Sequence, residues 1–206
     1  MYQVVKRIVD FSIAGIALVL LAPLMALVAL VIRCSMGKPV LFRQVRPGLN
    51  EKLFTCWKFR TMREERDAEG KILSDSQRLT PLGLFFRRTS LDELPQLWNI
   101  VRGDMSLVGP RPLLAQYLAY YTAEEKRRHL TRPGLTGWAQ IHGRNYLSFQ
   151  KRLAMDAWYV DHVSWRLDVR ILLATVWLVL TGKDVAMDPD QCGTLSEERK
   201  EQVQVN

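Results

Sequence analysis

The longest run of hydrophobic positions in the chain covers residues 11–32, where 22 consecutive residues carry no charge. As a straight helix this segment would be about 33 Å long, enough to match a bilayer core of about 30 Å. A secretory signal peptide has a shorter apolar core and a small-residue cleavage site, and no such site follows residue 32. Domain cores are usually lined by amphipathic helices, which this segment does not resemble. The pattern therefore predicts insertion into a membrane.

Basic residues flank the apolar segment on both sides. They are Lys6 and Arg7 before it, and Arg33, Lys38, Arg43 and Arg46 after it. Because basic residues beside membrane segments stay on the cytoplasmic side, both ends are expected there. Pro23 removes a backbone hydrogen bond near the middle, and a kink there would let the helix return to the face from which it entered. We therefore expect residues 1–36 to form a re-entrant membrane helix, with a kinked spanning helix as the alternative.

Shorter apolar runs and amphipathic segments follow. Residues 40–42 and 53–57 are strand candidates that would pair as a hairpin, whereas the polar residues 63–78 predict a loop. Residues 115–130 and 147–163 show the spacing of amphipathic helices.

The last apolar segment, residues 168–180, has helical spacing but almost no polar face. It is too short to span a bilayer and is expected at the membrane interface or in a core. Together the elements predict an α+β, mainly helical fold in a monotopic membrane protein. It would comprise a re-entrant helix at residues 1–36, a cytosol-facing domain with interfacial helices at residues 37–181, and a polar tail at residues 182–206.

The charge of the chain indicates an anionic partner. There are 29 basic and 21 acidic residues, of which three basic and six acidic ones lie after residue 181, so residues 1–181 carry a net charge of +11. A body this basic is expected to bind nucleic acid, a membrane surface or a phosphorylated substrate. Hydrophobic residues make up 48% of the chain and charged residues 24%, which argues against disorder.

Cysteines and histidines show no disulfide or metal pattern. They are Cys34, Cys56, Cys192, His129, His142 and His162. An odd number of widely spaced cysteines argues against a disulfide framework or a zinc knuckle, and the histidine spacing excludes a two-histidine metal helix. The chain is therefore expected to be reduced and to face the cytoplasm.

The adjacent carboxylates Asp92 and Glu93 are candidates for chemistry. One interpretation is a capping box, in which Ser90 begins a helix and Glu93 supports it. Pro95 would then lie inside that helix, where it cannot donate a backbone hydrogen bond, so a helix that begins at Pro95 fits better. The field of that helix N-terminus should lower the pKa of both carboxylates and keep them ionised. An ionised carboxylate can attack phosphorus or bind Mg²⁺.

Five arginines near predicted turns accompany this pair. They are Arg87, Arg88, Arg111, Arg132 and Arg144. The planar fork of a guanidinium matches phosphate oxygens, and prolines on both sides of Arg111 stiffen its backbone. The pattern therefore predicts a phosphate site, which Lys58 and Arg60 would join unless they lie at the level of the lipid headgroups.

Four segments resemble, in the same order, the motifs of the bacterial sugar transferase family, and in particular its small monotopic phosphoglycosyl transferases. They are KFRTM at residues 58–62, SLDELPQL at 90–97, GDMSLVGPRP at 103–112 and RPGLTGWAQ at 132–140. Together with the N-terminal apolar helix, the resemblance covers roughly residues 1–180. Four motifs in one order make a chance match implausible.

The resemblance implies an enzyme that moves a phosphosugar from a UDP-sugar to a polyprenyl phosphate, commonly undecaprenyl phosphate, as the first membrane step of glycoconjugate assembly. Asp92 would be the nucleophile that displaces UMP and carries the phosphosugar covalently. Glu93, together with Asp92, would hold Mg²⁺. Soluble donor and lipid acceptor would meet at the cytoplasmic face of the bacterial inner membrane, while the motifs leave the sugar unspecified.

The resemblance also implies a set of phosphate-binding residues. They are Lys58, Arg87, Arg111 and Arg144. Asp156 matches an acidic position late in the family pattern, and a salt bridge to one of these arginines is the alternative to a role in the reaction. Family members often have serine before the proline that breaks the re-entrant helix. This chain has Ala22, so the bend is expected to be shallower or held by other contacts.

Two other functions fit parts of the sequence. Asp188-Pro189-Asp190 imitates the D-x-D motif of metal-dependent glycosyltransferases, although it lies in the polar tail and follows no nucleotide-binding α/β domain. A non-catalytic membrane adaptor would bind anionic lipid through the basic face and would not depend on Asp92. Nucleic-acid binding would explain the charge but neither the apolar segment nor the acidic pair, so no nucleic-acid partner is expected. A homodimer is compatible with the sequence.

Overall fold

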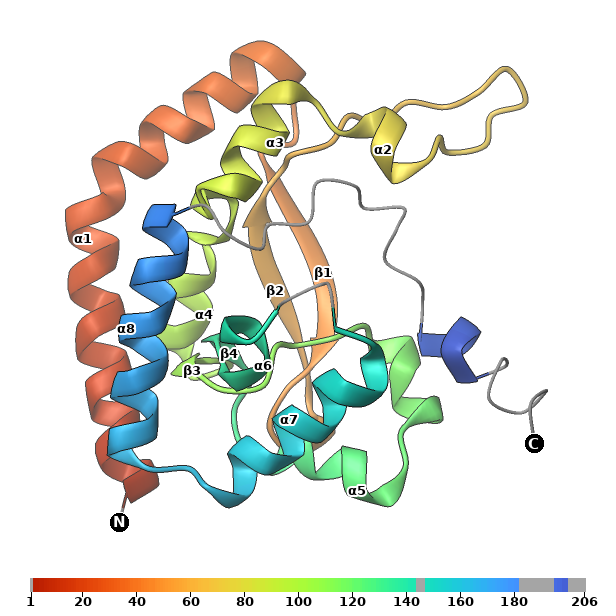
Figure 1. The fold of residues 1–206 in the computed structure, drawn as a ribbon. Coiled ribbons are helices and arrows are strands. Elements are labelled where there is room, and N and C mark those ends of the chain that lie inside the picture. The colour runs from red at the N-terminus through yellow and green to blue at the C-terminus, as the bar shows by residue number, and fades with distance from the viewer. Residues whose placement is uncertain (1, 144–146, 182–194, 200–206) are drawn as a thin grey trace.

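The computed structural model describes residues 2–143, 147–181 and 195–199. Within these ranges, α1 (Tyr2–Met36) is the one helix long and apolar enough to cross a membrane. Figure 1 shows α1 along one side of the molecule, bent along its length. Pro23 lies inside the helix, and proline is a usual cause of such a bend. The predicted apolar helix is confirmed, whereas its re-entrant path stays a prediction.

Most of the surface of α1 faces outward. Its buried residues are Lys6, Asp10, Ala14, Val28 and Ile32. The spacing of four residues within each group places its members on one helix face. Elsewhere the helix presents bare apolar side chains, with Val19 75% and Leu20 73% exposed. A large apolar surface that the described part of the protein leaves uncovered is typical of a membrane or partner contact.

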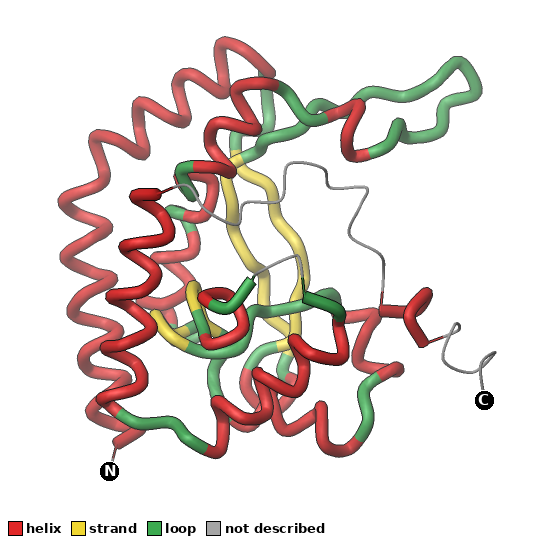
Figure 2. Tube along the Cα trace, viewed as in Figure 1, coloured by secondary structure: helices red, strands yellow, loops and turns green. Residues whose placement is uncertain are grey.

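After α1 the chain forms the predicted antiparallel hairpin, with β1 (Leu41–Pro47) and β2 (Leu53–Phe59) somewhat longer than the sequence indicates. The turn contains the 3-10 helix η1 (Leu49–Glu51). Figure 2 shows this hairpin as the main β element among helices. The polar residues 63–78 form the predicted loop, which projects from the body in Figure 1 and ends in α2 (Asp75–Arg78).

Three short helices then carry the chain past the acidic pair. They are α3 (Pro81–Arg88), the 3-10 helix η2 (Leu91–Glu93) and α4 (Gln96–Arg102). Thr80 begins α3, because its side-chain oxygen accepts a hydrogen bond from the backbone N–H of Gly83. Gly103 ends α4 in the left-handed conformation, with φ 91°.

A second, small sheet pairs β3 (Ser106–Val108) in parallel with β4 (Gly134–Thr136). The single helix predicted for residues 115–130 is wrong. The segment contains instead the 3-10 helix η3 (Ala115–Tyr120), α5 (Ala123–Lys126) and the 3-10 helix η4 (Arg127–Leu130). The chain is extended at Tyr121, and Thr122 then starts a new helix through a capping box with Glu125.

The C-terminal helices follow the short α6 (Trp138–Ile141). The predicted helix at residues 147–163 is confirmed as α7 (Phe149–Asp161), and α8 (Trp165–Thr181) extends the helix predicted at residues 168–180. Along α8, Asp168 and Ile171 are buried, whereas the side chains toward its end, such as Leu180, are exposed. This exposed apolar face agrees with an interfacial position, which stays a prediction.

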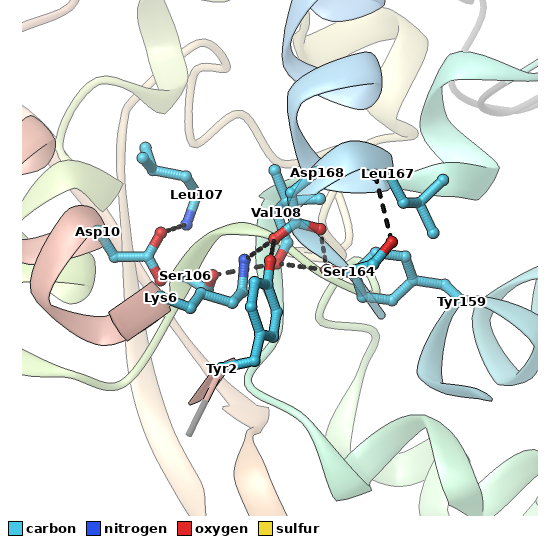
Figure 3. Close-up of polar contacts among 10 residues, drawn as sticks. All are labelled: Tyr2, Lys6, Asp10, Ser106, Leu107, Val108, Tyr159, Ser164, Leu167 and Asp168. Atoms are coloured by element: carbon cyan, nitrogen blue, oxygen red, sulfur yellow. Dashed lines mark hydrogen bonds and ion pairs between the residues drawn. The ribbon is translucent and has the colours of Figure 1, made fainter. Parts of the chain in front are cut away.

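Buried polar side chains join the start of α1 to α7 and α8, as Figure 3 shows. Lys6 forms an ion pair with Asp168 of α8, and the Tyr2 hydroxyl donates to the same carboxylate at 2.7 Å. Tyr159 of α7 donates to the other oxygen of Asp168, also at 2.7 Å. Every oxygen of this buried carboxylate therefore has a partner, as burial requires.

Asp10, one turn further along α1, binds β3 through both of its carboxylate oxygens (Figure 3). It accepts hydrogen bonds from the Ser106 hydroxyl at 2.7 Å and from the Leu107 backbone N–H at 3.2 Å. We call this set of side chains the anchor network. Its members are Tyr2, Lys6, Asp10, Ser106, Tyr159 and Asp168.

Candidate active site

The acidic pair lies in the turn between α3 and α4. Ser90 adopts the left-handed conformation, with φ 57°, and its side chain makes no capping hydrogen bond, so the capping-box interpretation is wrong. Asp92 and Glu93 belong to the one-turn helix η2, and Pro95 directly precedes α4. The predicted placement of the carboxylates just ahead of a helix is confirmed.

Glu93 is held by two cations from distant parts of the chain. Its Oε1 accepts from Lys58 Nζ of β2 at 2.5 Å and from Arg111 Nη2, in the segment after β3, at 2.8 Å. Burial alone would raise the pKa of Glu93, but the charges and hydrogen bonds of Arg111 and Lys58 outweigh it and hold this pKa well below its ordinary value. Glu93 is therefore a permanent anion at neutral pH.

Asp92 behaves differently from its neighbour. The residue is 7% exposed, and burial, followed by the negative charge of Glu93, raises the pKa of Asp92 to about 6. The prediction that the helix field lowers the pKa of both carboxylates is thus wrong for Asp92. Desolvation and like-charge repulsion outweigh the field of α4, a helix of only seven residues. Asp92 is still mostly ionised at pH 7, and it is more basic than an ordinary aspartate.

Arg87 of α3 is the third cation near the pair. Its Nε donates to the Thr61 hydroxyl at 3.1 Å. Burial lowers the pKa of Arg87, and the negative charge of Asp92 partly offsets that effect. The structure thus brings Lys58, Arg87 and Arg111, three of the four predicted phosphate-binding residues, around the acidic pair.

Two further predicted cations, Arg60 and Arg132, have their bonding partners away from the acidic pair. Arg144 and the D-x-D segment at residues 188–190 fall outside the described residues. Arg132 donates to the Gly103 carbonyl at 2.9 Å, at the end of α4. Arg60 donates to the carbonyls of Met36 and Gly37 and so closes the C-terminal end of α1 rather than joining the phosphate site.

A buried ion pair that the sequence does not predict supports Arg111. Arg128 Nη2 lies 2.8 Å from Asp156 Oδ2, and the same nitrogen donates to the backbone carbonyl of Arg111 at 2.6 Å. Both side chains are almost fully buried. Asp156 thus forms a salt bridge, but not with Arg87 or Arg111, two of the arginines expected for it. The sequence does not indicate this role of Arg128, because the residue lies in a run of basic residues that the sequence alone cannot tell apart.

The acidic pair suits one mode of Mg²⁺ binding. In the described part of the chain, no three His, Cys, Asp or Glu side chains cluster to hold a metal. Mg²⁺ is commonly held by one or two carboxylates together with waters and substrate phosphates, and Asp92 and Glu93 fit that mode. Lys58 and Arg111 both bind Oε1 of Glu93, and no hydrogen bond within the described residues engages its Oε2.

Comparison with known proteins supplies the family. A sequence profile described as bacterial sugar transferase matches residues 1–182. The chain belongs to the bacterial sugar transferase family. The resemblance seen in the four motifs is thereby confirmed, and with it the class of enzyme, because several relatives are named as undecaprenyl-phosphate sugar phosphotransferases.

Relatives within this family differ in length. The uncharacterized sugar transferase EpsL of Bacillus subtilis is 49% identical over 183 residues, which are 89% of this chain and 91% of that protein. A UDP-glucose:undecaprenyl-phosphate glucose-1-phosphate transferase of Caulobacter vibrioides is 42% identical over 187 residues, covering 85% of this chain and 70% of the relative. The chain spans only 40% of an Escherichia coli protein of the same name, at 37% identity over 185 residues.

Proposed function

We propose that this protein transfers a phosphosugar from a UDP-sugar to undecaprenyl phosphate, with Asp92 as the nucleophile. The observation that carries this proposal is the contrast within the acidic pair. Glu93 is bound by two cations, whereas no hydrogen bond or ion pair engages the Asp92 carboxylate among the described residues. A buried carboxylate that is ionised, unusually basic and without a partner is suited to covalent catalysis.

The proposed reaction has two displacements at one phosphorus atom. In the first, an Asp92 oxygen attacks the sugar-linked phosphate, and the bond to the bridging oxygen breaks, so that UMP leaves with the electron pair. In the second, a phosphate oxygen of the lipid acceptor attacks the same phosphorus, and the bond to Asp92 breaks. The carboxylate is regenerated, and the product is a polyprenyl diphosphosugar.

The cations around the pair match the charge that this reaction develops. Negative charge grows on the transferred phosphate and on the leaving oxygen, and preorganised donors beside it lower the barrier. Arg87 and Arg111 both lie close enough for the charge of Asp92 to act on them. Asp92 and Glu93 would hold Mg²⁺, whose charge would further neutralise the diphosphate.

We also propose that α1 is re-entrant and that the protein lies on the cytoplasmic face of the bacterial inner membrane. Both ends of α1 form hydrogen bonds with the region of the protein that follows this helix. Near the start, Arg7 donates to the carbonyls of Ile100 and Val101, at 2.5 and 2.7 Å. At the end, Arg60 donates to the Gly37 carbonyl at 2.8 Å. Attachment of both ends to one charged body favours their location on one side of a bilayer.

The experiment measures nucleotide release by protein purified in nanodiscs with Mg²⁺, undecaprenyl phosphate and a panel of UDP-sugars. We expect UMP from one donor, and without acceptor a protein mass increased by one phosphosugar. Asp92→Asn should abolish both signals, whereas the control Asp161→Asn, at an exposed carboxylate of α7, should keep them. Release of UDP instead of UMP, or activity in Asp92→Asn, would contradict the proposal.

A further inference from the structure

Arg46, near the end of β1, lies on the same face of the hairpin as Lys58. In the hairpin register Phe42 pairs with Lys58 and Gln44 pairs with Cys56. Paired residues share a face of the sheet, and residues two apart on one strand share it too. Arg46 therefore lies on the face from which Lys58 reaches Glu93. By its sequence position, Arg46 counts only among the basic residues that flank the apolar segment.

The contacts of Arg46 bring it beside Arg111. Its Nη1 donates to the carbonyl of Pro112, the residue after Arg111, at 3.3 Å, and its Nη2 donates to Gln44 Oε1. Both acceptors are neutral, and no carboxylate of the described residues forms an ion pair with Arg46. Lys58 and Arg111, in contrast, share the charge of Glu93.

The electrostatics of Arg46 are those of a cation that could bind an anionic ligand. Burial lowers the pKa of Arg46, an effect that Cys56 partly offsets, and the positive charge of Arg111 lowers this pKa further. Arg111 thus interacts electrostatically both with Asp92 and with Arg46. The side chain of Arg46 is only partly covered, so a ligand can reach it.

We propose that Arg46 binds the nucleoside-side phosphate of the UDP-sugar. This rests on the proposed function, in which Asp92 attacks the sugar-linked phosphate. The second phosphate lies one bridging oxygen away and needs a cation of its own, while Arg87 and Arg111 serve the transferred phosphate and Lys58 is bound by Glu93. The fork of Arg46 would hold this phosphate in the bound donor and in UMP as it departs.

The test compares Arg46→Ala and Arg46→Lys with a matched control, Arg43→Ala. Arg43 precedes Arg46 by three residues on the same strand, and it lies on the opposite face, stacked 4.4 Å from the ring centroid of Trp57. The dissociation constant of UMP is measured by calorimetry, and KM is measured separately for donor and acceptor. We expect Arg46→Ala to weaken UMP binding about 10- to 100-fold, since hydrogen bonds to charged groups are the strong ones. The donor KM should rise similarly, and the acceptor KM should not change.

Two further results sharpen the test. Arg46→Lys keeps the charge but not the fork and should lose several-fold in UMP affinity, while Arg43→Ala should stay within twofold of wild type. If Arg46→Ala does not fold, as judged by circular dichroism, Gln44→Ala carries the test, because it removes the acceptor that orients Arg46. It should weaken UMP binding by a smaller factor.

The inference is overturned if UMP affinity stays within twofold of wild type while kcat falls, because Arg46 would then only support Pro112 and Arg111. A selective loss of acceptor affinity, or a wild-type protein that binds neither UMP nor UDP, overturns it as well. A wild-type protein that binds UMP through Arg46 but releases none from any UDP-sugar would instead contradict the proposed reaction.

Discussion

The anchor network and the candidate active site both bury carboxylates beside cations, but they treat them in opposite ways. Asp168 receives bonds from Lys6, Tyr2 and Tyr159, so the buried charge is fully compensated. In the site, Glu93 takes both nearby hydrogen-bonding cations, and Asp92 has no bonded partner in the described residues. A satisfied network stabilises the fold, whereas an unsatisfied carboxylate remains available for chemistry.

The largest expected effect separates activity from stability at Asp92. Asp92→Asn should lower UMP release by at least about 1,000-fold, because the nucleophile is lost. The same change should raise the free energy of unfolding by about 1–3 kcal/mol at pH 8, since the folded pKa of about 6 lies above that of an unfolded aspartate. The free energy of unfolding of both proteins is measured by thermal unfolding at several pH values in the same detergent.

The sign of this gain depends on pH. A carboxyl whose pKa is raised by folding favours the native state below its unfolded pKa, and that contribution is lost as pH rises through about 6. The stability gain of Asp92→Asn should therefore vanish near pH 4. A variant that is less stable than wild type at pH 8 would show that Asp92 has a stabilising partner.

In the anchor network, loss of a carboxylate charge should lower stability instead of raising it. Asp168→Asn leaves the charge of Lys6 buried without its counter-charge, which should lower the free energy of unfolding by about 3–5 kcal/mol. The double variant Lys6→Met with Asp168→Leu removes both charges and should recover much of that loss. Thermal unfolding of the three proteins measures both values, and equal stability of single and double variants would contradict the pairing.

A smaller effect is expected on the pH dependence of the reaction. Asp92 must be ionised to attack, so kcat/KM should fall about tenfold per pH unit below about 6. Glu93→Gln removes the negative charge that raises the pKa of Asp92 and frees Lys58 and Arg111, so the acid limb should move to lower pH. Initial rates of UMP release between pH 4.5 and 8 measure the limb, and a limb that does not move would refute this origin of the pKa.

The smallest effect is expected where charges are exposed. Arg63 and Glu65, in the loop, form an ion pair with side chains 55% and 45% exposed. Glu65→Gln should change the free energy of unfolding by less than about 0.5 kcal/mol, and added salt should remove even that difference. A larger loss in thermal unfolding would show that burial is not what separates strong from weak pairs in this protein.

Features that depend on local patterns could be predicted from the amino-acid sequence. Uninterrupted hydropathy predicts α1, short apolar runs predict the hairpin, and Pro95 places the acidic pair ahead of α4. Four motifs carry the family, which the comparisons confirm. These signals lie within a few residues of one another, where helix and strand periods and proline geometry act directly.

Features that depend on contacts between distant residues could be found only in the folded chain. Lys58 meets Glu93 across 35 positions, and Arg128 meets Asp156 across 28. No periodicity encodes such pairs, so neither the support of Arg111 by Arg128 nor the place of Arg46 could be predicted. The raised pKa of Asp92 belongs here too, because burial depends on every segment that packs around the carboxyl, whereas the helix field depends on its neighbours alone.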